Sequence, residues 1–87
     1  MIKVQAIDNN TFKVVVDGPP TTTHTVTVDP AYYQKLTGKR VSMETLVSKS
    51  FEFLLQRESN RSILSTFDLP VIGHYFPEYE RTIGEML

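Results

Sequence analysis

The segment Ser42–Glu58, SMETLVSKSFEFLLQRE, carries the strongest helix pattern in the chain. Its apolar side chains recur at steps of three and four, which gathers them on one face of a helix. A helix of this length would measure about 25 Å, roughly the width of a small domain. We therefore predict one long amphipathic helix on which the rest of the chain packs. The apolar face consists of Met43, Leu46, Val47, Phe51, Leu54 and Leu55.

Upstream of this helix the chain has the alternating apolar and polar pattern of β-strands. Residues 2–7 and 11–17 alternate in this way, and Asp8-Asn9-Asn10 between them suits a tight turn. After a Gly-Pro-Pro turn, TTTHTVTV at 21–28 is rich in the β-branched residues that favour strands. We predict a three-stranded antiparallel meander over residues 1–28. In meander order the far edge of the last strand would be free for pairing.

Residues 29–58 are predicted to form two helices joined by a basic turn. Asp29-Pro30 is typical of a helix start, because Asp is a preferred N-cap and proline fits the first helical position. The short helix AYYQKLT should end at Gly38, a residue suited to the left-handed C-cap conformation. Lys39-Arg40 then forms the connection, and Ser42 caps the long helix.

The C-terminal segment, residues 59–87, combines apolar and acidic side chains. Phe67-Asp68-Leu69-Pro70 predicts another helix start, and Pro77 should interrupt that helix before a last one. The segment holds too many large apolar residues to be a solvated tail. The chain as a whole is therefore predicted to be a single α+β domain: a three-stranded antiparallel meander, a short helix, a long amphipathic helix and a C-terminal helical segment.

Composition limits the function classes. The chain has 87 residues, no cysteine and a net charge of −1, so it offers no disulfide framework and no overall attraction to nucleic acid. Residues 1–65 nevertheless carry a net charge of +2, and residues 66–87 a net charge of −3. No apolar run is long enough for a membrane span and the N-terminal residues lack a signal-peptide core, so we expect a cytoplasmic protein.

Catalytic and metal-binding patterns are weak. His74 and Glu78 are four residues apart, but Pro77 lies between them and no third ligand follows nearby. The serines have no general base at a recognisable spacing, and the isolated glycines cannot form a phosphate loop. We predict a protein that is not an enzyme and has neither a metal site nor a cofactor.

Over residues 23–58, the chain resembles the ribbon-helix-helix module of Arc/MetJ-like bacterial repressors and antitoxins. The stretch that carries the resemblance is HTVTVDPAYYQKLTGKRVSMETLVSKSFEFLLQRE. The resemblance implies a homodimer in which two copies of the strand form a ribbon that enters the major groove of duplex DNA. Three departures stand against it: a shorter first helix, a preceding hairpin, and no Arg, Lys, Asn or Gln on the strand. The implied DNA contacts are Thr23, Thr25 and Thr27 to bases, and Lys39, Arg40 and Ser42 to phosphates. The alternative is a threonine-rich strand on a solvated sheet face.

Large apolar residues in the C-terminal segment also allow two interpretations. They could form a second layer of the core. They could instead form a docking segment for a protein partner, framed by acidic side chains, as the resemblance to antitoxins implies. The residues concerned are Phe67, Leu69, Ile72, Tyr75, Phe76 and Tyr79. The leading hypothesis is therefore a DNA-binding regulator or antitoxin, and the alternative is a protein–protein interaction module that does not bind nucleic acid. The homodimer would form through the edge of strand 21–28 or the apolar face of the long helix.

Overall fold

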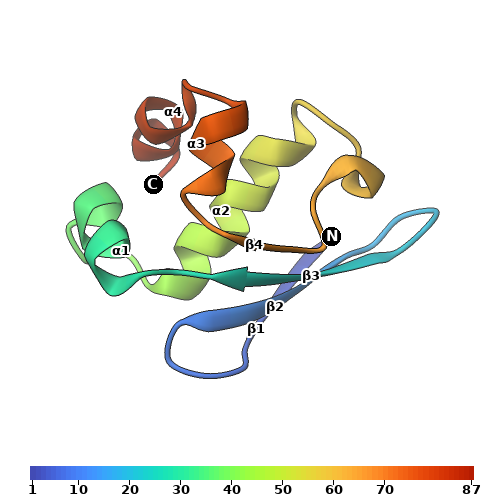
Figure 1. Ribbon diagram of the computed structural model, residues 1–87, viewed down its shortest axis with the longest axis horizontal. Helices are drawn as coiled ribbons and strands as arrows, with labels where there is room; N and C mark the ends of the chain where they lie inside the picture. The colour runs from blue at the N-terminus through green and yellow to red at the C-terminus, as the bar shows by residue number, and fades with distance from the viewer.

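The computed structural model describes all residues, 1–87, and has a sheet with helices packed on one face (Figure 1). The class is α+β, as predicted. The strands are β1 (Ile2–Ala6), β2 (Thr11–Val16), β3 (Thr22–Thr27) and β4 (Thr66–Asp68). The helices are α1 (Pro30–Thr37), α2 (Met43–Leu55), the 3₁₀ turn η1 (Asn60–Ser62), α3 (Val71–Tyr75) and α4 (Tyr79–Met86).

The antiparallel meander of β1, β2 and β3 is confirmed. Val4 lies opposite Val14, and Val14 lies opposite His24, so apolar side chains line up on the inner face of the sheet. In the first turn the Asp8 carboxylate accepts the Asn10 N–H at 3.0 Å, and this bond holds the pKa of Asp8 below its ordinary value. The turn residues thus close the hairpin as their types predict.

The sheet has a fourth strand that the sequence pattern did not reveal. β4 runs parallel to β3, with Val26 opposite Phe67, and the order is β1-β2-β3-β4. The Thr25 N–H donates to the Ser65 carbonyl at 2.7 Å, and the Leu69 N–H donates to the Thr27 carbonyl at 2.9 Å. The predictions of a three-stranded sheet and of a free edge on strand 21–28 were therefore wrong. A three-residue strand is too short to show a period, and its position depends on contacts distant in sequence.

The two predicted helices and their turn are confirmed. Gly38 ends α1 in the left-handed conformation, with φ of 60°, and its N–H donates to the Gln34 carbonyl. Ser42 caps α2, because its Oγ accepts the Thr45 N–H at 3.1 Å. α2 ends at Leu55, three residues earlier than the pattern predicted. Downstream, Pro77 separates α3 from α4, as expected.

A single hydrophobic core lies between the sheet and the helices. α2 crosses the inner face of the sheet and buries Leu46, Val47 and Phe51 there. α4 packs on α2 through Tyr79 and Ile83, which are fully buried. It is also bound to α1, since the Tyr32 hydroxyl donates to Glu80 at 2.9 Å; burial and this bond raise the pKa of Tyr32. None of the helices has the length and apolar character needed to cross a membrane.

Candidate docking groove

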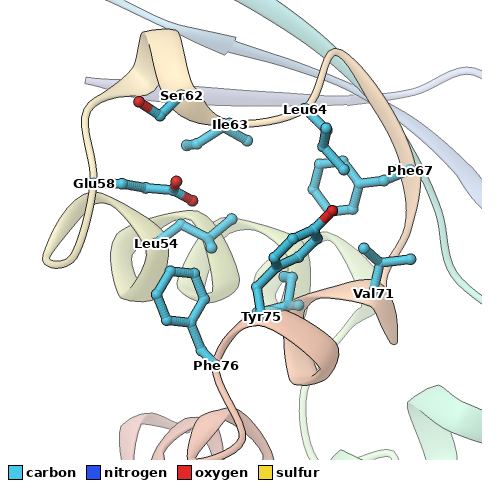
Figure 2. A pocket seen from close by; sticks show the side chains of 10 residues that line it. Leu54, Glu58, Ser62, Ile63, Leu64, Phe67, Val71, Tyr75 and Phe76 are labelled. Carbon is cyan, nitrogen blue, oxygen red and sulfur yellow. The ribbon is translucent and has the colours of Figure 1, made fainter.

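A half-open apolar groove lies between the C-terminal end of α2, the connection from η1 to β4, and α3 (Figure 2). Its volume is about 260 Å³. Eight of its ten lining residues are hydrophobic, and Glu58 is the only charged one. The lining consists of Leu54, Glu58, Ser62, Ile63, Leu64, Phe67, Val71, Ile72, Tyr75 and Phe76.

The floor of the groove belongs to the hydrophobic core. Leu54 ends the apolar stripe of α2, and Phe67 is the inward-facing residue of β4. Ile63 and Ile72 complete the floor, and all four side chains are buried. Because core packing holds them in place, the bottom of the groove is rigid.

The rim of the groove is apolar and open to solvent. The Tyr75 residue is 66% exposed and Leu64 is 46% exposed, which is high for large hydrophobic residues. Val71 and Phe76 beside them are only partly buried. Figure 2 shows Glu58 and Ser62 toward one end of the groove and Val71 toward the other. The rim therefore offers apolar surface that the chain does not itself cover.

Glu58 has no ion-pair partner in the chain. The three ion pairs join Lys35 to Glu80, Lys49 to Glu52 and Arg57 to Glu78. Glu58 is half-buried beside apolar side chains, and it lies three residues after the end of α2. Its carboxylate is thus the one charge in the groove that a cation from outside can pair with.

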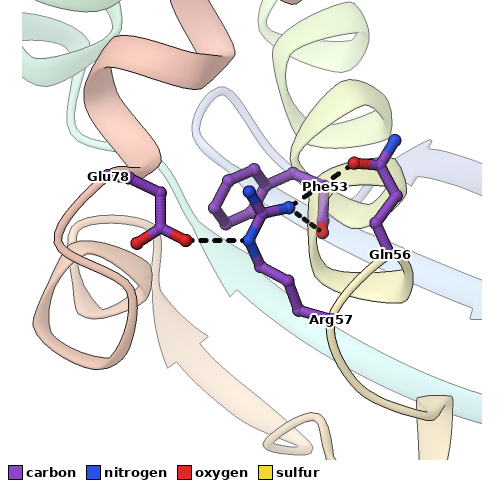
Figure 3. Close-up of polar contacts among 4 residues, drawn as sticks. All are labelled: Phe53, Gln56, Arg57 and Glu78. Atoms are coloured by element: carbon purple, nitrogen blue, oxygen red, sulfur yellow. Dashed lines mark hydrogen bonds and ion pairs between the residues drawn. The ribbon is translucent and has the colours of Figure 1, made fainter.

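Arg57, the neighbour of Glu58, is held elsewhere (Figure 3). Its Nε donates to Glu78 Oε2 at 2.9 Å, and its Nη1 donates to the Phe53 carbonyl at 3.2 Å. The guanidinium also lies over the Phe53 ring, 3.7 Å from the ring centroid. The bond from Arg57 holds the pKa of Glu78 below its ordinary range. Arg57 therefore links the end of α2 to the start of α4 and leaves Glu58 free.

A buried histidine fixes the wall that carries Leu64. His24 Nδ1 donates to the Leu64 carbonyl at 2.7 Å, and Nε2 accepts from the Thr22 hydroxyl at 2.9 Å. The Asn60 amide then donates to Thr22 Oγ1 at 3.1 Å and to the Pro20 carbonyl at 2.9 Å. These bonds tie the connection between η1 and β4 to β3, so the groove has a fixed wall on this side.

The predicted partner-binding residues divide into two groups. Phe67, Ile72, Tyr75 and Phe76 line the groove. Leu69 and Tyr79 are fully buried away from it, and the Tyr79 hydroxyl donates to Ser50 Oγ at 2.7 Å. Burial raises the pKa of Tyr79. The sequence analysis missed the groove residues contributed by α2 and the following connection, of which Glu58 and Leu64 matter most, because only the folded chain brings them to α3.

The predicted DNA-contacting residues lie in two places. Thr23, Thr25 and Thr27 are on the outer face of the sheet, which no helix covers. The other three lie in the turn between α1 and α2, where two are already engaged. Arg40 Nε donates to the Thr37 carbonyl at 2.9 Å, and the Ser42 hydroxyl caps α2; Lys39 has a φ of 62°. β4 occupies the edge of β3 that a shared ribbon would need.

The hydroxyl of Ser50 is bonded within the core, where it donates to the Leu46 carbonyl at 2.7 Å. No group of three His, Cys, Asp or Glu side chains is placed to hold a metal ion.

Comparisons with protein-family models, curated proteins and solved structures found no match to this chain.

Proposed function

We propose that this chain is a non-catalytic protein-interaction domain that binds a short peptide segment of a partner protein in the groove. The segment would carry an apolar side chain next to a Lys or Arg. One observation supports this most directly: an apolar groove with an exposed rim contains a single carboxylate, Glu58, that has no ion-pair partner. Contacts of this kind occur where apolar anchors of a partner enter a pocket.

The size of the groove favours a side chain over a free small molecule. Its volume is about 260 Å³. Pockets for drug-sized ligands usually have about 300–1,000 Å³. One or two apolar side chains of a peptide fit the smaller space. They would cover Tyr75 and Leu64, and burial of such partly exposed side chains contributes about 1 kcal/mol each.

The charge of the region favours a basic partner. Glu58 is the only charged residue that lines the groove, and it has no ion-pair partner, whereas Glu78 and Glu80 are paired with Arg57 and Lys35. An unpaired carboxylate attracts basic segments and repels acidic ones, which gives selectivity. A cation beside the apolar anchor would pair with Glu58.

The test is an NMR titration of the labelled protein with two capped pentapeptides, Gly-Leu-Arg-Leu-Gly and the same peptide with Glu in place of Arg. We expect amide shifts confined to the groove residues. An exposed ion pair contributes up to about 1 kcal/mol, so the Arg peptide should bind about fivefold more tightly than the Glu peptide. Absence of shifts at millimolar peptide, or shifts centred elsewhere, would contradict the proposal.

Matched variants locate the binding. Tyr75→Ala should weaken both peptides, whereas His74→Ala, on the exposed side of the same helix, should leave both unchanged. Glu58→Gln should remove the preference for the Arg peptide. Glu85→Gln, an exposed carboxylate on α4 without an ion pair, should keep it. A preference that survives Glu58→Gln would exclude Glu58 as the cation partner.

A second candidate is contact with duplex DNA through the outer face of the sheet. The observation that favours it is the row of outward threonines on β3, with Lys13 opposite Thr25 in the register and Lys3 on the same face. Fluorescence anisotropy with a random-sequence duplex tests it. Affinity should fall steeply with added salt and fall again on Lys13→Gln, since cation–phosphate contacts release counterions. Unchanged anisotropy at low salt would reject this candidate.

A further inference from the structure

β1 is the longer of the two edge strands of the sheet, and β4, the other edge strand, has three residues. Met1 and Ile7 direct backbone groups toward β2: the Met1 carbonyl accepts the Asp17 N–H at 3.0 Å, and the Ile7 N–H donates to the Thr11 carbonyl at 2.8 Å. Backbone groups alternate in direction along an antiparallel strand. The N–H and C=O groups of Ile2, Val4 and Ala6 therefore point outward from the free edge.

The side chains along this edge are largely apolar. Ile2 and Val4 pack on the core but remain partly exposed, and Ala6 is exposed. At the two ends of the strand, Met1 is 80% exposed and Ile7 is 59% exposed. β1 contains no proline, and its pairing with β2 is continuous, so it lacks two of the devices that protect edge strands from pairing.

We propose that two copies of this chain pair antiparallel through β1, with the two-fold axis at Val4, to form one continuous eight-stranded sheet. The segment Met1–Ile7, MIKVQAI, has the same order of apolar and polar residues in both directions. Val4 then lies opposite Val4 of the second copy, and Ile2 lies opposite Ala6. Every outward N–H and C=O group of these residues gains a partner in this register. The exposed Met1 side chain meets Ile7 of the second copy.

The charges along the edge select this register. With the axis at Val4, Lys3 faces Gln5 of the second copy on the outer face of the sheet. With the axis at Lys3, two lysines would face each other. Like charges directly opposite each other destabilise a strand pair. With the axis at Gln5, Ile2 would face Asp8 of the second copy, which lies in the turn after β1 with its N–H directed to the Thr11 carbonyl. The net charge of −1 per chain adds little repulsion between copies.

The first experiment measures the association state of the unmodified chain by sedimentation velocity, from micromolar to millimolar concentration. A pairing of one short strand belongs to the weak end of protein interfaces. We expect the mass to rise from 9.9 kDa to about twice that value over this range. A constant mass of one chain would overturn the proposal. A tetramer or larger species would also overturn it, because a closed two-fold pairing ends at two copies.

Cysteine pairing then tests the register in a chain that has no cysteine of its own. Lys3→Cys and Gln5→Cys are prepared separately, one with a C-terminal tag, and oxidised alone or mixed. Residues that face each other in a pair without mutual hydrogen bonds have Cα atoms about 4.5 Å apart, within disulfide reach. We expect the mixed disulfide to form in several-fold excess over either symmetric one. A predominant symmetric product, or equal linking with the control Thr23→Cys, would overturn the register.

A backbone variant separates dimerisation from folding. The Ala6 N–H points away from β2, so Ala6→Pro removes a hydrogen bond of the proposed dimer and none of the monomer. Ala6→Ser keeps the N–H and serves as the matched control. We expect Ala6→Pro to retain the NMR spectrum of the folded core while weakening dimerisation at least tenfold. Dimerisation unaffected by Ala6→Pro would place the interface elsewhere, which contradicts the proposal.

Discussion

The N-terminal meander, residues 1–28, and the C-terminal segment, residues 59–87, build the same core in different ways. The meander uses regular alternation and local turns, and each of its strands pairs with the next one along the chain. The C-terminal segment uses a three-residue strand and two short helices, and it contributes Phe67, Leu69, Tyr79 and Ile83 to the core. The regular meander leaves a largely polar outer face on the sheet, whereas the irregular C-terminal segment leaves the apolar groove beside α3.

The largest effect should come from deleting the irregular region. Removal of residues 66–87 takes away β4, α3 and α4, and with them several fully buried side chains of the core. A chain of this size has a small free energy of unfolding, so we expect the truncated protein to be unfolded. Circular dichroism and amide NMR dispersion measure this. A cooperatively folded 1–65 fragment would show that the meander and α2 form a core alone, and it would make the C-terminal segment an appended module.

Within the C-terminal segment, single substitutions should separate core from groove. Leu69→Ala removes a fully buried side chain and should lower the free energy of unfolding by about 2–5 kcal/mol. Leu64→Ala, at the exposed rim, should change it by about 0.5 kcal/mol or less. Urea unfolding of the two variants makes the comparison. Similar losses for both would mean that Leu64 belongs to the core, and the groove would lose its open rim.

The sequence predicted the meander and the two central helices because their signals are local. Asp29, Gly38 and Ser42 lie at helix ends as their types predict, and alternation identified β1 to β3. β4 could not be found in this way, since Thr66–Asp68 is extended only because β3 and the core accept it there. The sequence singled out Tyr75 and three other lining residues of the groove, but Glu58 and Leu64 escaped because they meet Tyr75 only through folding, and neither alone differs from an ordinary surface residue.

His24 joins the two regions, and its substitution should lower the free energy of unfolding by an intermediate amount. His24→Leu keeps an apolar side chain of similar size but leaves the Leu64 carbonyl and the Thr22 hydroxyl without their partner. The loss of a buried partner costs about 1–3 kcal/mol. Thr25→Ala, on the outer face of the same strand, is the control and should change stability little. Urea unfolding measures both variants, and His24→Leu with unchanged stability would show that the connection from η1 to β4 is held by packing alone.

The smallest effect concerns the surface link between α2 and α4, and it should disappear in acid. The bond from Arg57 holds the pKa of Glu78 below its ordinary value, so the folded state favours the ionised carboxylate. Its contribution is therefore present above the ordinary Glu pKa, near 4.3, and is lost as the pH falls through the lowered folded value. Glu78→Gln should lower the free energy of unfolding slightly at neutral pH and flatten the acid limb of the stability–pH curve, so that its curve meets that of the unmodified protein at low pH. Glu85→Gln, which breaks no ion pair, should keep the limb as it is. Parallel acid limbs for Glu78→Gln and the unmodified protein would assign the acid sensitivity to other carboxylates, and the two helices would then be joined by buried contacts such as the packing of Phe53 on Tyr79 and the Ser50–Tyr79 hydrogen bond.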